Sequence, residues 1–295
     1  MMHVKNRAQP DARRFVALET TLLAHGVPKA EAQPLANELD RIILDAGALP
    51  AVVGVVHGVP TVGLTAAELD KLLHADDVPK ANTSNLGVLM HRGGHAATTV
   101  SATMEIAAAA GVQVFATGGI GGVHRGFAVH PDISADLCAL ARFPVAVVAS
   151  GVKAILDVPA TREALETLGV PVIGFQTDRF PAFYLRDGGT GVDARFDDAD
   201  ALGRFLASEL ARTGRGVLVV QAIAAEHEIA RSDWDSWLND AANAAGSEES
   251  GRNVTPRMLA ELHARSGGMT LRANLALVKG NAHLAAMICR SMCKA

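Results

Sequence analysis

Short apolar runs alternate with amphipathic segments along the chain. The apolar runs are rich in Val, Ile and Ala, as in buried strands, and the segments between them repeat apolar residues every three or four positions, as helices do. The expected strands cover residues 15–23, 51–56, 61–64, 112–116, 145–148, 172–175 and 217–220. The expected helices cover residues 31–45, 99–110, 134–142, 199–213, 255–266 and 271–292, and two more begin at 65 and 153.

This alternation of strands and helices predicts an α/β fold, with three α/β/α layers around a mostly parallel or mixed sheet. The runs at 51–56 and 61–64 are close enough to form a hairpin. The sequence Thr-Ala-Ala-Glu at 65–68 is a capping box that begins a helix. Because no repeat or linker divides the chain, we expect a loose leader over residues 1–14 and a single domain over residues 15–295.

One segment combines a strand, a glycine-rich loop and polar side chains. Residues 112–137 read VQVFATGGIGGVHRGFAVHPDISADL. Glycine lets the backbone approach another group closely and adopt positive φ, and α/β proteins bind ligands at the carboxyl ends of their strands. The loop has neither the Lys-Ser/Thr ending of a P-loop nor the spacing of a dinucleotide fingerprint. Without further evidence, a glycine-rich surface turn is an equal alternative.

Composition and charge narrow the class of protein. The chain has 295 residues, of which 49% are hydrophobic and 20% charged, which argues against disorder. A net charge of −4 without a basic tract argues against nucleic-acid binding. No apolar run reaches the ~18 residues of a membrane helix, and the first residues do not resemble a signal peptide. Three cysteines are too few for a disulfide framework, so we expect a soluble, cytoplasmic protein.

Several longer motifs resemble the pseudouridine-5'-phosphate glycosidase family, also called the indigoidine synthase A-like family. They are TTVSATMEIAAAAGVQVFATGGIGGVHRG at 98–126, DISADL at 132–137, VVASGVKAILD at 147–157 and GVPVIGFQTDRFPAFY at 169–184. The likeness extends from VALETTLLAHGVP at 16–28 to NLALVKGNAHLAA at 274–286, which is nearly the whole chain. It implies an enzyme that reversibly cleaves the C1'–C5 bond of pseudouridine 5'-phosphate, giving uracil and ribose 5-phosphate. It also implies a homotrimer.

Lys153 is the expected nucleophile. It follows the apolar run at 143–149, near the expected carboxyl edge of the sheet. Apolar neighbours disfavour the ammonium form of a lysine and favour the nucleophilic amine. The alternative is an ordinary lysine at a helix start, although that position favours anions. The resemblance implies that Lys153 attacks C1' and forms an imine with the ring-opened ribose.

Glu19 and Asn274 are the other two expected catalytic residues. Glu19 lies within an apolar run, and burial raises the pKa of a carboxyl group towards the range of a general acid. A glutamate that faces water at a strand edge is the alternative. The resemblance implies that Glu19 protonates C5 of uracil and that Asn274 contacts the base or sugar ring, supported by Asn281. Helix packing is the alternative for both asparagines.

The remaining site residues concern a metal ion and the phosphate. The resemblance implies that Asp136 binds a divalent cation, Mn²⁺ or else Mg²⁺, with water completing the shell, although a carboxylate early in a helix is also an ordinary dipole partner. The loop N–H groups at 118–122 are suited to an anion. The expected substrate-binding side chains are Lys80, Thr99, Thr117, His124 and Ser134, and Arg125 is expected to pair with a carboxylate.

Two segments depart from the family pattern and leave the substrate preference open. Ser84-Asn85-Leu86 stands where the family has Arg-Asp-Leu, and Gln221-Ala222-Ile223-Ala224 replaces Asn-Pro-Ile-Pro. One alternative function is a Schiff-base lyase or aldolase that acts on another sugar phosphate or C-nucleotide. Another is a non-catalytic protein that binds phosphosugars.

Overall fold

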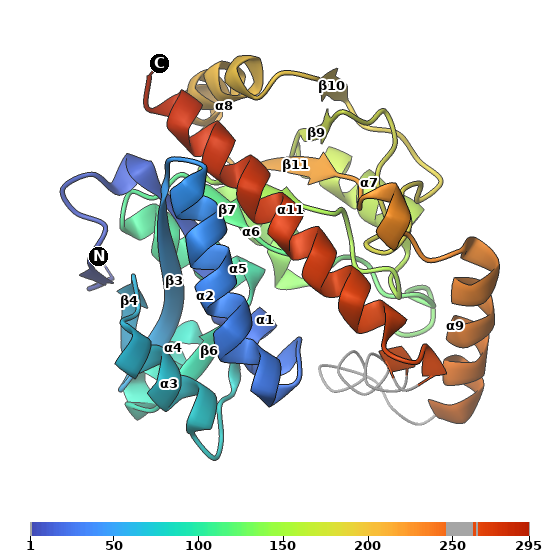
Figure 1. Cartoon of the computed structure of the whole chain (residues 1–295), viewed down its shortest axis with the longest axis horizontal. Coiled ribbons are helices and arrows are strands. Elements are labelled where there is room, and N and C mark those ends of the chain that lie inside the picture. The colour runs from blue at the N-terminus through green and yellow to red at the C-terminus, as the bar shows by residue number, and fades with distance from the viewer. Residues whose placement is uncertain (1, 246–261, 264, 295) are drawn as a thin grey trace.

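A computed structural model describes residues 2–245, 262–263 and 265–294. Within these residues the chain forms one mixed sheet (Figure 1). Its strands are β1 (Lys5–Asn6), β2 (Phe15–Glu19), β3 (Leu49–Val56), β4 (Val59–Val62), β5 (Lys80–Ala81), β6 (Ala96–Thr98), β7 (Val114–Ala116), β8 (Ala146–Ala149), β9 (Val172–Phe175), β10 (Ala194–Phe196) and β11 (Val217–Gln221). The main strand order is β1-β4-β3-β2-β7-β8-β11-β9-β10, and β6 joins β5 to β3.

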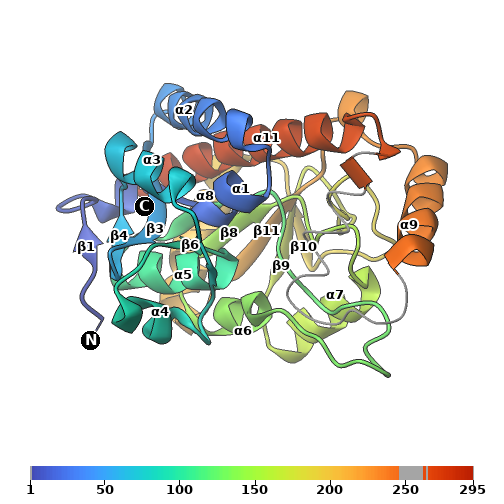
Figure 2. The same cartoon turned by 90° about the horizontal axis from the view of Figure 1, so that it is seen from below.

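Helices cover both faces of the sheet. They are α1 (Thr20–His25), α2 (Lys29–Asp45), α3 (Ala66–His74), α4 (Leu86–Arg92), α5 (Val100–Ala109), α6 (Ala135–Arg142), α7 (Val158–Thr167), α8 (Ala199–Thr213), α9 (Arg231–Ala245) and α11 (Met269–Met292). Figure 2 shows α2 and α11 on one side of the sheet and α4 to α7 on the other. This arrangement confirms the three-layer α/β/α fold around a mixed sheet. No helix in the described part of the chain is long and apolar enough to span a membrane.

The centre of the sheet determines where polar side chains gather. β2, β7, β8, β11 and β9 pair in parallel, and nearly all their residues are buried. Buried parallel strands need apolar side chains on both faces, which explains the continuous apolar runs in the sequence. Because parallel strands share one carboxyl edge, Glu19 at the end of β2 lies at the same edge of the sheet as Thr117 and Ser150, which directly follow β7 and β8.

The structure confirms the hairpin and revises two boundaries. β3 and β4 are antiparallel, as predicted. The strand expected at 15–23 ends at Glu19, where its register with β3 ends, and α1 begins at Thr20. The helix expected from Lys153 begins at Val158, because the side chain of Asp157 caps it there and a proline occupies its first turn. Most of the helix expected at 255–266 lies outside the described residues.

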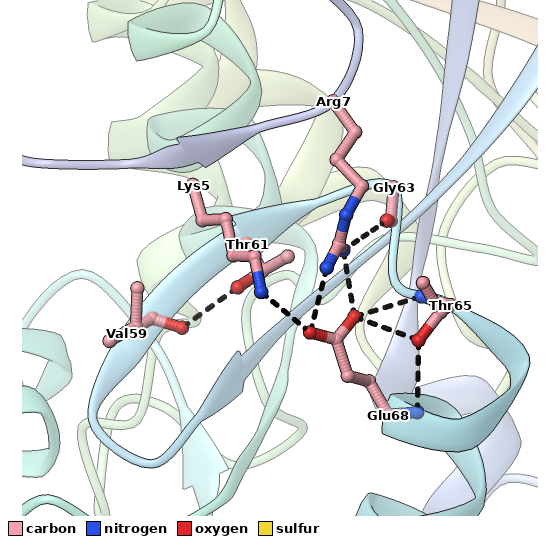
Figure 3. A network of polar contacts seen from close by, with 7 residues as sticks. All are labelled: Lys5, Arg7, Val59, Thr61, Gly63, Thr65 and Glu68. Atoms are coloured by element: carbon pink, nitrogen blue, oxygen red, sulfur yellow. Dashed lines mark hydrogen bonds and ion pairs between the residues drawn. The ribbon is translucent and has the colours of Figure 1, made fainter.

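The expected loose leader is attached to the sheet at β1. β1 pairs in parallel with β4, and Figure 3 shows the polar network that fixes it. Lys5 Nζ donates to Glu68 Oε1 at 2.9 Å, and Arg7 donates to both carboxylate oxygens at 2.7 and 2.8 Å. Glu68 also completes the predicted capping box with Thr65. The guanidinium of Arg7 lowers the pKa of Glu68 well below its usual range, so the ionised carboxylate joins the N-terminal strand to α3.

Candidate active site

One cavity lies at the carboxyl edge of the central strands. Glu19, Lys80 and Lys153 contribute charged side chains to it, and Asn274 reaches it from α11. Gly118 and Gly119 form part of its wall. Residues from five separate parts of the chain therefore meet here, as expected for a ligand site at the carboxyl ends of parallel strands.

Glu19 is buried in this cavity, with only 8% of its surface exposed. The hydroxyl of Thr117 donates a hydrogen bond to its Oε1 atom. Burial raises the pKa of Glu19 to about 7, and the positive charges of Lys153 and Lys80 oppose this rise. A carboxyl group with this pKa can hold a proton near neutral pH and release it during a reaction, as predicted for a general acid.

Lys153 lies in a closely packed turn and lines the same cavity as Glu19. Its backbone N–H donates to the carbonyl of Ile120 at 3.1 Å. Gly151, two residues earlier, has φ +75°, and a Cβ there would lie 1.8 Å from the carbonyl oxygen of Pro181. The turn thus requires glycine, and it presents the half-buried Lys153 side chain to the cavity.

Lys80 supplies the second positive charge. Burial lowers its pKa, the charge of Lys153 lowers it further, and Glu19 opposes both effects. Asn85 donates to the Lys80 carbonyl at 3.0 Å. The Ser-Asn-Leu segment that departs from the family pattern therefore supports the backbone that carries Lys80.

The glycine loop is packed closely against its neighbours, and this explains its composition. The glycines at 118, 119, 121 and 122 do not have positive φ, so that part of the expectation is wrong. The expected close approach of the loop backbone to other groups is confirmed. A Cβ at Gly119 would lie 2.6 Å from the Phe183 ring, and one at Gly121 would lie 2.3 Å from Ser134 Oγ. Asn281 donates to the Thr117 carbonyl at 2.9 Å, so it supports the start of this loop.

Asp136 binds two backbone segments. Its Oδ1 accepts from the N–H of Ser101 at 2.9 Å, and its Oδ2 accepts from the N–H of Gly121 at 2.8 Å. The carboxylate therefore ties the first turn of α5 to the glycine loop. Each carboxylate oxygen retains one lone pair, and the described residues contain no group of three or more His, Cys, Asp or Glu side chains suited to a metal. Asp136 fits a hard cation only as a single protein ligand with water around the ion.

The other expected substrate-binding residues have different positions. Lys80 and Thr117 line the cavity, whereas Thr99, His124 and Ser134 are not part of its lining. Thr99 and Ser134 are the N-cap residues of α5 and α6. Their roles in binding stay predictions.

Two further sequence expectations concern residues that lie outside the cavity lining. Arg125 Nε donates to the Ile155 carbonyl at 3.2 Å, so its predicted carboxylate partner is replaced by backbone. Gln221, Ala222 and Ala224 of the segment at 221–224 line a separate pocket with Arg186 and His283. That departure from the family pattern therefore has no direct contact with the cavity.

Asn274 presents an unpaired acceptor. Its Nδ2 donates to the Gly26 carbonyl at 3.2 Å, while its buried Oδ1 has no partner among the described residues. Buried polar atoms in folded proteins nearly always have a partner. An unpaired acceptor in a cavity wall indicates a ligand that donates a hydrogen bond.

The aromatic wall of the cavity was not predicted from the sequence. Phe183 and Tyr184 meet edge to face with ring centroids 4.7 Å apart, and Tyr184 lies 5.3 Å from Trp234. His263 also lines the cavity. The one feature of the sequence that could have indicated this wall is the rarity of these residue types, since the chain has one tyrosine and two tryptophans. Aromatic side chains of this kind suit a flat, unsaturated ring.

Known proteins resemble this chain over nearly its whole length. A pseudouridine-5'-phosphate glycosidase from Geobacillus kaustophilus is 43% identical over 97% of this chain and 96% of its own, and one from Symbiobacterium thermophilum is 44% identical over 94% and 92%. The crystal structure of an indigoidine synthase A-like protein from Thermotoga maritima has a TM-score of 0.89, at 33% identity, over 98% of this chain and 96% of its own. The prealnumycin C-glycosynthase AlnA, solved with ribulose 5-phosphate, has a TM-score of 0.90, at 32% identity, over 99% and 97%.

The family model described as indigoidine synthase A like protein matches residues 4–291. The match includes β2 with Glu19, Thr117 directly after β7, the turn of Lys153 and the helix of Asn274. The chain therefore belongs to the indigoidine synthase A-like family.

Proposed function

We propose that this protein is a pseudouridine-5'-phosphate glycosidase, which cleaves the C1'–C5 bond to give uracil and ribose 5-phosphate. The observation that carries this proposal is the placement of Lys153 and the buried Glu19, with its raised pKa, in one cavity. The cavity thus offers an amine and a carboxylic acid to the same substrate. Relatives with this activity are 43% and 44% identical to the chain.

The reaction needs a covalent route because the bond is carbon to carbon. Glycosidases that cleave C–O bonds protonate the leaving oxygen, but C5 of uracil carries no such atom. Lys153 Nζ bonds to C1' as the C1'–O4' bond breaks, and the proton lost by nitrogen goes to O4'. The nitrogen lone pair then forms the imine as the C1'–C5 bond breaks, and Glu19 supplies the proton that C5 takes up. Water hydrolyses the imine and frees ribose 5-phosphate and Lys153.

The other cavity residues orient the substrate. Lys80 is suited to bind the phosphate because its ammonium group is positively charged and lines the same cavity as Lys153. Phe183, Tyr184 and Trp234 provide apolar surface for the uracil ring, and Asn274 Oδ1 provides an acceptor. Asp136 would hold Mn²⁺, or Mg²⁺, with water ligands, and the ion would supply positive charge that fixes the sugar phosphate.

Trapping with borohydride tests the covalent step. The wild-type protein, incubated with ribose 5-phosphate and borohydride, should gain the mass of a reduced ribose 5-phosphate adduct on the peptide that contains Lys153. Lys153→Met should give no adduct and should lower the rate of uracil release by at least a thousandfold, whereas Lys279→Met, which removes a lysine that pairs with Glu38, should behave as wild type. An adduct on another lysine, or full activity of Lys153→Met, would refute the mechanism.

A second candidate is a Schiff-base enzyme that acts on another sugar phosphate. The neighbour AlnA is a C-glycosynthase that was solved with ribulose 5-phosphate. Both enzymes would form an adduct on Lys153, so uracil release from pseudouridine 5'-phosphate decides between them. A protein that only binds phosphosugars would form no adduct.

The assembly and the compartment of the protein are part of the same proposal. The family resemblance supports a homotrimer, and light scattering on the purified protein measures this directly. The lack of a membrane-spanning helix in the described residues is compatible with the predicted cytoplasmic location, which cell fractionation tests.

A further inference from the structure

His263 lines the cavity, and it was not among the residues indicated by the sequence. It is half-buried and lies on the same cavity as Asn274 and Trp234. Its Nδ1 atom forms a hydrogen bond with Thr270 Oγ1. No described residue pairs with its Nε2 atom.

The hydrogen bonds around Thr270 determine which nitrogen of His263 carries the proton. Ser266 Oγ donates to the His263 carbonyl at 3.1 Å, which uses the only hydrogen of that hydroxyl. Ser266 Oγ and Thr270 Oγ1 are 2.9 Å apart, and with the Ser266 hydrogen used in this way we assign Thr270 as the donor in that contact. With its hydrogen used, Thr270 Oγ1 can only accept from His263. This network assigns the proton to Nδ1 and leaves Nε2 with its lone pair.

The surroundings keep this imidazole neutral. Burial lowers the pKa of His263, and Thr270 is fully buried. The neutral ring, held by Nδ1, has Nε2 as a hydrogen-bond acceptor. The lining of the cavity thus includes the buried, unpaired acceptor Asn274 Oδ1. It also includes His263, whose hydrogen bond to Thr270 uses Nδ1 and not Nε2.

Two acceptors match the base of the proposed substrate. A uracil joined to the sugar through C5 has free N–H groups at both N1 and N3, whereas a uracil joined through N1 has one. We propose that His263 Nε2 accepts a hydrogen bond from a ring N–H of the C5-linked base and so contributes to the choice of C-nucleotide over N-nucleotide. This inference rests on the proposed glycosidase function, and it makes His263 a specificity residue.

Kinetics with methylated substrates test the inference. The wild-type protein should discriminate against either the N1-methyl or the N3-methyl derivative of pseudouridine 5'-phosphate. His263→Ala should raise the KM for the unmethylated substrate about tenfold, as expected for one hydrogen bond, with little change in kcat, and should lose that discrimination. His263→Gln, which retains an acceptor, should have a KM closer to that of the wild type and should keep part of the discrimination against the methylated substrate. Equal KM and equal discrimination in wild type and His263→Ala would overturn the inference.

A measurement on the wild-type protein tests the inference without depending on whether a variant folds. With ¹⁵N-labelled histidine, His263 should show the Nδ1–H tautomer, and its Nε2 resonance should shift when uracil is added. The Nε2–H tautomer, or an Nε2 resonance that uracil leaves unchanged, would contradict the inference. Should the wild type release no uracil, the glycosidase function fails, and the uracil titration still decides the role of His263. Borohydride trapping of ribose 5-phosphate should be the same in His263→Ala and wild type, because ribose 5-phosphate carries no uracil ring for His263 to contact.

Discussion

The hydroxyl of Thr117 donates a hydrogen bond to Oε1 of Glu19 inside the cavity. This contact joins the ends of two neighbouring parallel strands, β7 and β2. It stabilises the ionised form of Glu19, and thereby opposes the effect of burial on the pKa of that carboxyl group. Thr117 therefore adjusts the acidity of the residue that we expect to protonate C5.

Thr117→Val should extend the activity to higher pH. A general acid is active when protonated, so the rate falls as pH rises through the pKa of Glu19, about 7. Loss of a hydrogen bond to the charged form raises that pKa, and a bond of this kind contributes about 1.5–3 kcal/mol. The alkaline limb of kcat against pH should move up by about one to two pH units, because 1.36 kcal/mol corresponds to one unit of pKa.

Thr117→Ser is the matched control because it retains the hydroxyl. Its alkaline limb should coincide with that of the wild type. A Thr117→Val profile that also coincides with the wild type would show that Glu19 does not set the alkaline limb.

Glu19→Gln should abolish uracil release and stabilise the fold at neutral and alkaline pH. The pKa of Glu19 is about 7 in the folded protein and 4.5 as its ordinary value. The folded state thus binds more protons between these values, and the stability of the wild type falls as pH rises from 4.5 to 7. Above pH 7 the variant should be more stable by up to about 3 kcal/mol, a figure that already includes the charges of Lys153 and Lys80, because both lower the pKa of Glu19.

Urea unfolding of both proteins between pH 5 and 8 measures this difference. The gap in the free energy of unfolding should widen with pH and then become constant. A gap that narrows over this range would mean that Glu19 is stabilised as a carboxylate.

Asp136→Asn should destabilise the protein and remove bound Mn²⁺. An asparagine has one acceptor oxygen and an amide that donates, so it cannot accept from both Ser101 and Gly121 as the carboxylate does. An unpaired buried N–H costs about 1–3 kcal/mol, and thermal unfolding should show this loss. Titration with Mn²⁺, followed by electron paramagnetic resonance, should show binding by the wild type and none by the variant.

Asp132→Asn is the control for the metal. Asp132 lies four residues before Asp136, outside α6, and its Oδ2 atom is 3.7 Å from Nε2 of His124. This variant should bind Mn²⁺ as the wild type does. Loss of the metal in Asp132→Asn, with binding retained in Asp136→Asn, would assign the ion to Asp132.

Gly121→Ala should destabilise the fold because the glycine loop has no room for a methyl group. The added Cβ would lie 2.3 Å from Ser134 Oγ and 2.9 Å from Asp136 Oδ2. Overpacking of this kind typically lowers the free energy of unfolding by about 1–3 kcal/mol. Gly87→Ala is the matched control, since nothing lies within 4 Å of its Cβ, and alanine is favoured in helices by about 1 kcal/mol. Equal melting temperatures of the two variants would contradict the packed loop.

The sequence alone determined the layers of this protein and predicted the two side chains that we propose to react. Continuous apolar runs predicted buried parallel strands because both faces of such strands need apolar side chains. The hairpin of β3 and β4 and the capping box at Thr65 depend on local sequence, and both are present as predicted. Lys153 and Glu19 were identified from their apolar surroundings and from family motifs, and the structure places both in one cavity.

The tertiary structure alone decided which polar atoms have partners. Asp136 and Asn274 were both predicted to contact ligands, yet the Asp136 oxygens accept backbone hydrogen bonds while Asn274 Oδ1 has no partner among the described residues. The partners of Asp136 lie 35 and 15 positions away in sequence. His263 and Trp234 join the cavity in the same way, because contacts between distant segments depend on packing, which the local sequence does not encode.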